Sequence, residues 1–170
     1  ISKQSIDKQP ADRHRRAATD DEFAALIEAA HKGPIVRNLT GEQRAMLYLV
    51  AAYSGLRVQE LASMTAASIR EDCVVVPGKF TKNGQPATQP LRADVAAMLQ
   101  PWLEKQSGLL WPGSWWNKAA EMMRHDQNAA GIAYETDEGV FDFHALRVTY
   151  VTNLARAGVH PKIAQQLARH

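Results

Sequence analysis

The sequence predicts a mostly α-helical domain with a small antiparallel β-sheet or hairpin insert. Apolar residues recur at helical spacing along most of the chain, which is typical of amphipathic helices. Residues 73–90 break this period, with three consecutive valines followed by an Asn-Gly pair. Valine favours strands, and Asn-Gly favours a two-residue hairpin turn with positive φ at both positions. We therefore expect several helices around one small sheet.

Three helices are expected in the first part of the chain. The first covers about 20–32, with Thr19 as its cap and acidic residues in its first turn. The second covers about 41–54 and is apolar on nearly every side, which predicts a central, buried helix. Gly55 interrupts the pattern, and a short third helix is expected over 58–64.

Helical patterns resume after the predicted sheet. They cover about 94–104, 114–130 and 143–157, and a last helix begins with Pro161 at its first position. Asp142 is placed to cap the third of these helices. In the second, an apolar stripe indicates a buried side, and the opposite face is predicted to be polar, with Lys118, Arg124 and Gln127.

Length and composition fit one soluble-type domain with a polar arm. Residues 1–17 are basic and polar and are predicted to be a linker or arm, with a folded domain over 18–170. The first residue is Ile1 rather than Met, so we expect a fragment of a longer protein. A single cysteine excludes an internal disulfide, and no apolar run is long enough for a membrane span. A cytoplasmic location follows as an expectation.

Two arginines lie in apolar segments, where a charged side chain requires an interaction partner. In "AAYSGLRVQEL", Arg57 follows a helix that should be buried, although a guanidinium stays charged and is seldom buried alone. In "FHALRVTYVTNLARAG", His144 and Arg147 are three residues apart, which places them on one helix face. Lys82 near the hairpin tip and His170 at the chain end could join them.

These segments together resemble the tyrosine recombinases, the phage-integrase-like enzymes. "YSGLRVQEL" resembles the family's first arginine box, "FTKNGQPATQPL" its β-hairpin lysine segment, and "HALRVTYVTNLARAGV" its H-x-x-R box. "QQLARH" resembles the next box, which ends in a histidine, while "DDEFAALIEAA" and "WWNKAAEMMRHDQNAAGI" are similar to two helices of the catalytic domain. The resemblance covers residues 13–170 in the family's order. It implies the catalytic core of a DNA breaking-rejoining enzyme over residues 18–170, incomplete at its C-terminus, and makes residues 1–17 the linker from a preceding DNA-binding domain.

The resemblance also implies the roles of the site residues. Arg57 and Arg147 would clamp the scissile phosphate, where guanidinium forks match the non-bridging oxygens. Lys82 would protonate the leaving 5′ oxygen, although Lys79 in the same segment remains an alternative. His144 and His170 would assist proton transfer and hold phosphate oxygens, Glu60 would orient the site, and no metal or other cofactor is called for.

The sequence departs from the family pattern at two positions. The family forms a 3′-phosphotyrosyl link with a tyrosine that follows the last histidine box, and all four tyrosines here lie upstream of His170. We therefore expect the nucleophile after His170 and no DNA cleavage by this fragment; Tyr150 is expected to be a core residue. The second departure is Arg169, where the family commonly has glycine.

Double-stranded DNA is the partner that the resemblance implies. The full-length protein would act as a homotetramer on two duplexes, in the bacterial or phage nucleoid, and this fragment would be a monomer without membrane contact. Phosphate contacts would supply most of the affinity. The candidate DNA-contacting residues are Arg13, Arg15, Arg16, Lys79, Lys118 and Arg124.

Three alternatives share parts of this pattern. A type IB topoisomerase would use the same pocket to relax supercoils, and a degenerate integrase would keep the pocket without activity. A DNA-binding regulator is also possible, because "LARAGVHPKIAQQLARH" is compatible with a helix-turn-helix. In a regulator, however, Arg57 and Lys82 would have no reason to converge on the face that carries His144 and Arg147.

Overall fold

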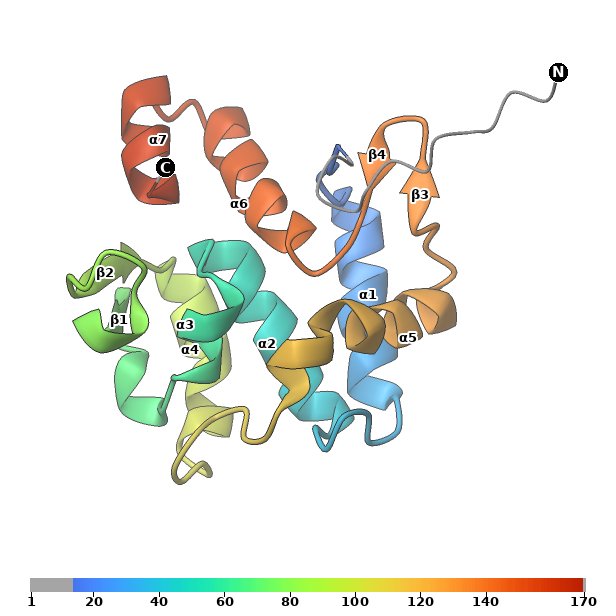
Figure 1. The fold of residues 1–170 in the computed structure, drawn as a ribbon, viewed down its shortest axis with the longest axis horizontal. Helices are drawn as coiled ribbons and strands as arrows, with labels where there is room; N and C mark the ends of the chain where they lie inside the picture. The colour runs from blue at the N-terminus through green and yellow to red at the C-terminus, as the bar shows by residue number, and fades with distance from the viewer. Residues whose placement is uncertain (1–13, 170) are drawn as a thin grey trace, which may run out of the picture.

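A computed structural model describes residues 14–169 (Figure 1), so the predictions for Arg13 and His170 lie outside the described residues. None of the helices within this range is both long and apolar enough to cross a membrane. The helices are α1 (Asp20–Lys32), α2 (Gly41–Ser54), α3 (Val58–Ala62), α4 (Ala93–Leu103), α5 (Ala119–Ala130), α6 (Ala145–Arg156) and α7 (Pro161–Ala168). The strands are β1 (Cys73–Val76), β2 (Ala87–Pro90), β3 (Glu135–Thr136) and β4 (Gly139–Val140).

The first two helices begin where their capping residues predict. Thr19 accepts a hydrogen bond from the backbone N–H of Glu22, and the Glu22 carboxylate accepts the N–H of Thr19 in return. Thr40 and Gln43 make the same reciprocal pair at the start of α2. Such boxes satisfy donors that a helix start leaves without partners. The predicted starts are therefore confirmed.

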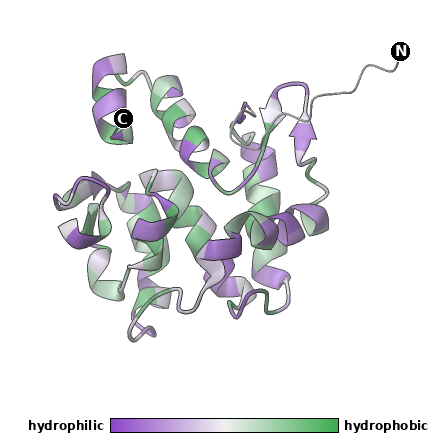
Figure 2. Ribbon diagram, in the orientation of Figure 1, coloured by the Kyte–Doolittle hydropathy of each residue, from purple (hydrophilic) through white to green (hydrophobic). Residues whose placement is uncertain are grey.

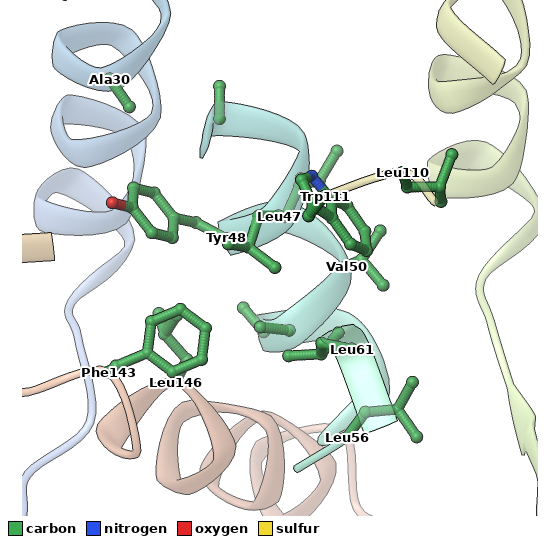
Figure 3. Packing of buried hydrophobic residues seen from close by; sticks show 14 of the residues in the cluster. Ala30, Leu47, Tyr48, Val50, Leu56, Leu61, Leu110, Trp111, Phe143 and Leu146 are labelled. Atoms are coloured by element: carbon green, nitrogen blue, oxygen red, sulfur yellow. The ribbon is translucent and has the colours of Figure 1, made fainter. Parts of the chain in front are cut away.

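Helix α2 lies at the centre of the molecule. Helices α1 and α6 pack against it, and α5 packs against α1 (Figure 1). In Figure 3, Leu47 and Val50 of α2 point toward Trp111 on one side, while Tyr48 points to another side, toward α1. Burial on several sides explains why the helix is apolar nearly all round. The outer helices α6 and α7 instead alternate between apolar and polar residues along their turns (Figure 2).

The predicted hairpin is present, but its turn differs from the expectation. Strands β1 and β2 pair antiparallel from Cys73–Pro90 to Val76–Ala87, so residues 77–86 form a ten-residue loop rather than a two-residue turn. Within it only Gly84 has positive φ, at 71°. The Asn83 side chain instead accepts the N–H of Gln85 and contacts Thr81, which stabilises a longer loop.

The segment 114–130 also differs from the prediction of one helix. A single 3₁₀ turn, Trp115–Lys118, precedes α5. Gln127 is only 1% exposed, so its assignment to the polar face was wrong. Its amide donates a hydrogen bond to the backbone carbonyl of Phe141, and this partner compensates for burying a polar side chain.

The end of the predicted arm is part of the folded domain. The backbone N–H of Arg16 donates a hydrogen bond to the carbonyl of Val140 in β4. The Arg16 guanidinium binds the Glu22 carboxylate at 2.8 and 3.0 Å. Arg16 is only 6% exposed. Arg15 binds both carboxylate oxygens of Asp142 at 2.9 Å. Arg16 is therefore used within the fold, and Arg15 forms an intramolecular ion pair; the DNA contacts expected of these two arginines stay a prediction.

Candidate active site

The predicted site residues meet in one cavity of about 660 Å³. Its walls come from four segments far apart in the sequence: the start of α3, the β1–β2 loop, the turn before α5 and the start of α6. The predicted members among its lining residues are Arg57, Glu60, Lys79, Lys82, His144 and Arg147.

Gly55 sets the position of Arg57. It ends α2 in the left-handed conformation, with φ of 65°, and an added Cβ would lie 2.3 Å from the ring of Tyr150. Glycine is therefore required both by the backbone and by the close packing. The chain then turns, and Arg57 precedes the first turn of α3, where its N–H donates to Glu60 Oε2 at 2.8 Å. Short fixed segments of this kind hold a functional side chain in place.

Arg147 is the more deeply buried of the two predicted arginines, at 6% exposed. Its guanidinium donates to the carbonyl oxygens of Gly55 and Ala168, which connects α6 to the end of α2 and the end of α7. Burial, together with the positive charges of Arg57 and Arg169, lowers the pKa of Arg147 to about 10. At pH 7 the side chain still carries its charge.

Glu60 is the single carboxylate among three guanidiniums. It is 1% exposed, and its Oε2 accepts hydrogen bonds from the Arg57 backbone and from the Arg169 side chain. Its Oε1 lies 3.7 Å from Arg57 Nη1 and has no hydrogen-bond partner among the described residues. Counting Arg147, the cluster carries two positive charges in excess. A partly buried positive excess of this kind favours an anion in the cavity.

His144 begins α6, and its ring is accessible from the cavity. Partial burial lowers its pKa below the usual value, and the positive charges of Arg15, Arg147 and Arg57 act in the same direction. Asp142 acts in the opposite direction without reversing the shift. The imidazole is therefore neutral at pH 7 and can accept a proton.

The β1–β2 loop brings both candidate lysines to the cavity. Lys79 lies over the ring of Phe80, at 4.8 Å from its centroid. Lys82 occupies a central position of the turn that the Gly84 N–H closes onto the Thr81 carbonyl. Both lysines are exposed and line the cavity, so Lys79 and Lys82 remain alternatives for the general acid.

None of the four tyrosines, all within the described residues, lines the cavity. Tyr150 is 6% exposed and its hydroxyl accepts a hydrogen bond from Gln89, which confirms that it is a core residue. Tyr48 is fully buried and donates to Asp126. The attacking group that the resemblance implies is therefore none of these side chains.

Two further residues predicted to contact DNA, Lys118 and Arg124, are exposed. Lys118 Nζ is 3.2 Å from Glu121 Oε1, and the Arg124 guanidinium lies 4.0 Å from the ring centroid of Tyr134.

Within residues 14–169, no three His, Cys, Asp or Glu side chains are arranged to hold a metal ion.

Three features of the site region escaped the sequence analysis. Arg44 is buried in α2 and bound to Asp126, although the argument that an arginine in an apolar helix needs a partner applied to it equally. Trp116 is 36% exposed and lines the cavity, whereas the other three tryptophans are buried in the core. Arg169 was noted only as a departure from the family pattern, yet its side chain reaches Glu60.

The fold and the cavity define a domain of the DNA-integrase class. The model of the phage integrase family matches residues 16–170, and the chain belongs to this family. A comparison with curated protein sequences gives no match.

Solved structures with the same fold are recombinases and integrases. XerA recombinase superposes with a TM-score of 0.71 at 20% identity, covering 96% of this chain and 57% of that one. The λ integrase catalytic core gives 0.67 at 22% identity, covering 91% of both chains. The catalytic domain of bacteriophage HP1 integrase gives 0.68 at 15% identity, covering 92% of this chain and 82% of that one. These likenesses confirm the predicted tyrosine-recombinase catalytic fold.

Proposed function

We propose that the chain is the catalytic domain of a site-specific DNA recombinase that breaks and rejoins phosphodiesters through a 3′-phosphotyrosyl link. The observation that supports this most directly is the cavity itself. Arg57 and Arg147 line it from α3 and α6, its arginine cluster has one carboxylate for three guanidiniums, and a lysine loop and a neutral histidine complete its walls.

The proposed reaction needs three kinds of group at one phosphate. Arg57 and Arg147 stabilise the negative charge that develops on the non-bridging oxygens, and one such preorganised donor typically contributes about 3–4 kcal/mol. Lys82 or Lys79 donates a proton to the leaving 5′ oxygen. His144, and His170 by the resemblance, accept the proton of the attacking tyrosine or hold the phosphate. Glu60 orients the first arginine, and the proposal places the tyrosine in a segment after His170.

Double-stranded DNA is the proposed partner. λ integrase has been solved as a dimer bound to a core site and as a tetramer bound to a Holliday junction. By analogy, the longer protein would act as a tetramer on two duplexes in the cytoplasm of a bacterium, while this fragment stays monomeric. Lys79, Lys118 and Arg124 are exposed side chains that could contact the DNA backbone. Arg13 remains a candidate from the sequence alone.

The convergence of the two arginines argues against a helix-turn-helix regulator. Such a protein would use the exposed side chains of α7 and would have no need to bring Arg57 and Arg147 to one cavity, which both of them line. A topoisomerase would share the pocket and differ in its product. A relaxation assay on supercoiled plasmid with a tyrosine-containing longer chain separates this alternative from strand exchange.

The cavity can be tested directly with orthovanadate, which mimics a phosphate at its transition state. We expect a crystal soaked in orthovanadate to show one anion contacting both Arg57 and Arg147. Titration calorimetry should show that Arg57→Met weakens binding at least tenfold, whereas Arg70→Met, which removes the same charge from an exposed position outside the cavity, does not. An anion bound elsewhere, or equal affinities of the two variants, would contradict the proposal.

A further inference from the structure

Arg169 adopts a backbone conformation that few non-glycine residues tolerate. Its φ is 53° and its ψ 43°, and among residues 14–169 only Arg37 and Asn38 share a positive φ without being glycine. Left-handed residues without glycine's freedom persist where surrounding contacts hold them. The contacts of Arg169 therefore need an explanation.

Both the backbone and the side chain of Arg169 reach the arginine cluster. The Arg169 Nη2 donates to the Oε2 of Glu60, and the Arg169 carbonyl accepts a hydrogen bond from Arg57 Nη2 at 3.3 Å. The preceding carbonyl, of Ala168, accepts from Arg147. The end of α7, Arg169 included, thus contacts the other three charged members of the cluster, Arg57, Glu60 and Arg147.

Glu60 needs a cation, and two arginines compete for it. Its carboxylate is 1% exposed, and a buried carboxylate without a partner is costly. The Arg169 guanidinium makes the hydrogen bond, whereas Nη1 of the Arg57 guanidinium stays 3.7 Å from Oε1. The Arg57 side chain remains 35% exposed at the cavity, compared with 20% for Arg169. Without Arg169, Arg57 is the next cation in reach of the carboxylate.

We propose that Arg169 is a positioning residue: by binding Glu60, it keeps the Arg57 guanidinium available for a phosphate in the cavity. This inference rests on the proposed function of the cavity. Arg169 also adds one positive charge to the cluster, which further favours an anion. Glycine at this position would relax the backbone but would leave Glu60 to compete for Arg57.

The test measures orthovanadate affinity in variants of this chain. We expect Arg169→Met, which keeps a long side chain without charge, to weaken orthovanadate binding about tenfold relative to the Arg70→Met control. Arg169→Gly should weaken it similarly, although glycine accepts the left-handed backbone without strain. This second variant keeps the test valid if the methionine variant folds poorly, and circular dichroism reports folding in each case.

A purely structural role for Arg169 would give a different result in a Glu60→Gln background. A glutamine carries no charge to attract Arg57, so removing Arg169 there should lower the affinity less than threefold. A loss in that background as large as in the wild type would show that Arg169 does not act through Glu60 and would overturn the proposal.

The remaining outcomes separate the two proposals. If Arg57→Met abolishes orthovanadate binding and Arg169→Met binds like Arg70→Met, the cavity is an anion site and the positioning role is wrong. If Arg57→Met binds like the wild type, the anion site itself is wrong, and the inference fails with it.

Discussion

Two arginine clusters in the molecule differ in how fully their charges are compensated. Arg44 in α2 is fully buried, and its Nε and Nη2 bind the Asp126 carboxylate at 2.8 and 3.0 Å. Its Nη1 donates to the carbonyls of Pro34 and Leu39, and Tyr48 donates to Asp126 at 2.7 Å. One positive charge meets one negative charge, and each guanidinium nitrogen has a partner.

The second cluster is left unbalanced. Arg57 and Arg169 approach the carboxylate of Glu60, whereas Arg147 binds two backbone carbonyls. Both Glu60 Oε1 and Arg169 Nε lack hydrogen-bond partners among the described residues. This cluster lines an open cavity, whereas Arg44 is sealed in the core. Burial alone therefore does not distinguish the two clusters; they differ in uncompensated charge and in access to a cavity.

The largest change in the free energy of unfolding is expected from removing the negative charge of the balanced cluster, in which Arg44 binds Asp126. Asp126→Asn should destabilise the fold by about 3–5 kcal/mol, because it leaves the buried Arg44 without its counter-charge. Urea unfolding followed by circular dichroism measures the change. Arg70→Met on the exposed surface should stay within about 0.5 kcal/mol. A similar small effect for Asp126→Asn would mean that the ion pair contributes little.

The corresponding carboxylate-to-amide substitution in the unbalanced cluster should lower the free energy of unfolding less. Glu60→Gln keeps an oxygen that can accept the Arg57 N–H, so we expect a loss of about 1–3 kcal/mol from the weakened bond to Arg169. Orthovanadate affinity should not fall, because the cavity becomes more positive. Unfolding and calorimetry on one preparation test both parts, and a fall in affinity would contradict the charge argument.

Removing Arg57 should separate stability from binding. Its side chain makes only a 3.3 Å bond to the Arg169 carbonyl and a 3.7 Å approach to Glu60. Arg57→Met should therefore change the unfolding free energy by less than about 1 kcal/mol, while orthovanadate binding falls at least tenfold. A loss of stability comparable with that of Asp126→Asn would place Arg57 with the structural arginines.

The smallest effect concerns the pH dependence of His144. Because its pKa is lowered in the folded protein, the native state favours the neutral ring. Its contribution to stability is present above the ordinary pKa of about 6.5 and is lost as the pH falls through the lower, folded value. NMR titration of the ring should give a midpoint below 6.5, and Arg15→Met should raise it by removing a nearby positive charge. An unchanged midpoint in Arg15→Met would show that the charge of Arg15 does not contribute to the shift.

Much of the fold follows from short-range sequence signals. The caps Thr19 and Thr40, the apolar circumference of α2 and the stop at Gly55 each act within a few residues, so the helix boundaries could be predicted. The order of the charged segments was enough to predict the family, because each segment is local. The convergence of Arg57, the lysine loop and the His144–Arg147 helix on one cavity followed from the resemblance, and the structure brings these residues together.

Only the tertiary structure decided which charges are neutralised. Arg44 and Asp126 are 82 residues apart, Arg15 and Asp142 are 127 apart, and Arg169 and Glu60 are 109 apart. No periodicity connects such pairs, so the sequence could not show that Arg15 and Arg16 are held within the fold, that Gln127 is buried, or that Arg169 binds Glu60. Composition and spacing determined the helices and the kind of site in this chain. The three-dimensional packing determined which arginine keeps a charge available for a phosphate, because a side chain's electrostatic partner depends on proximity in space.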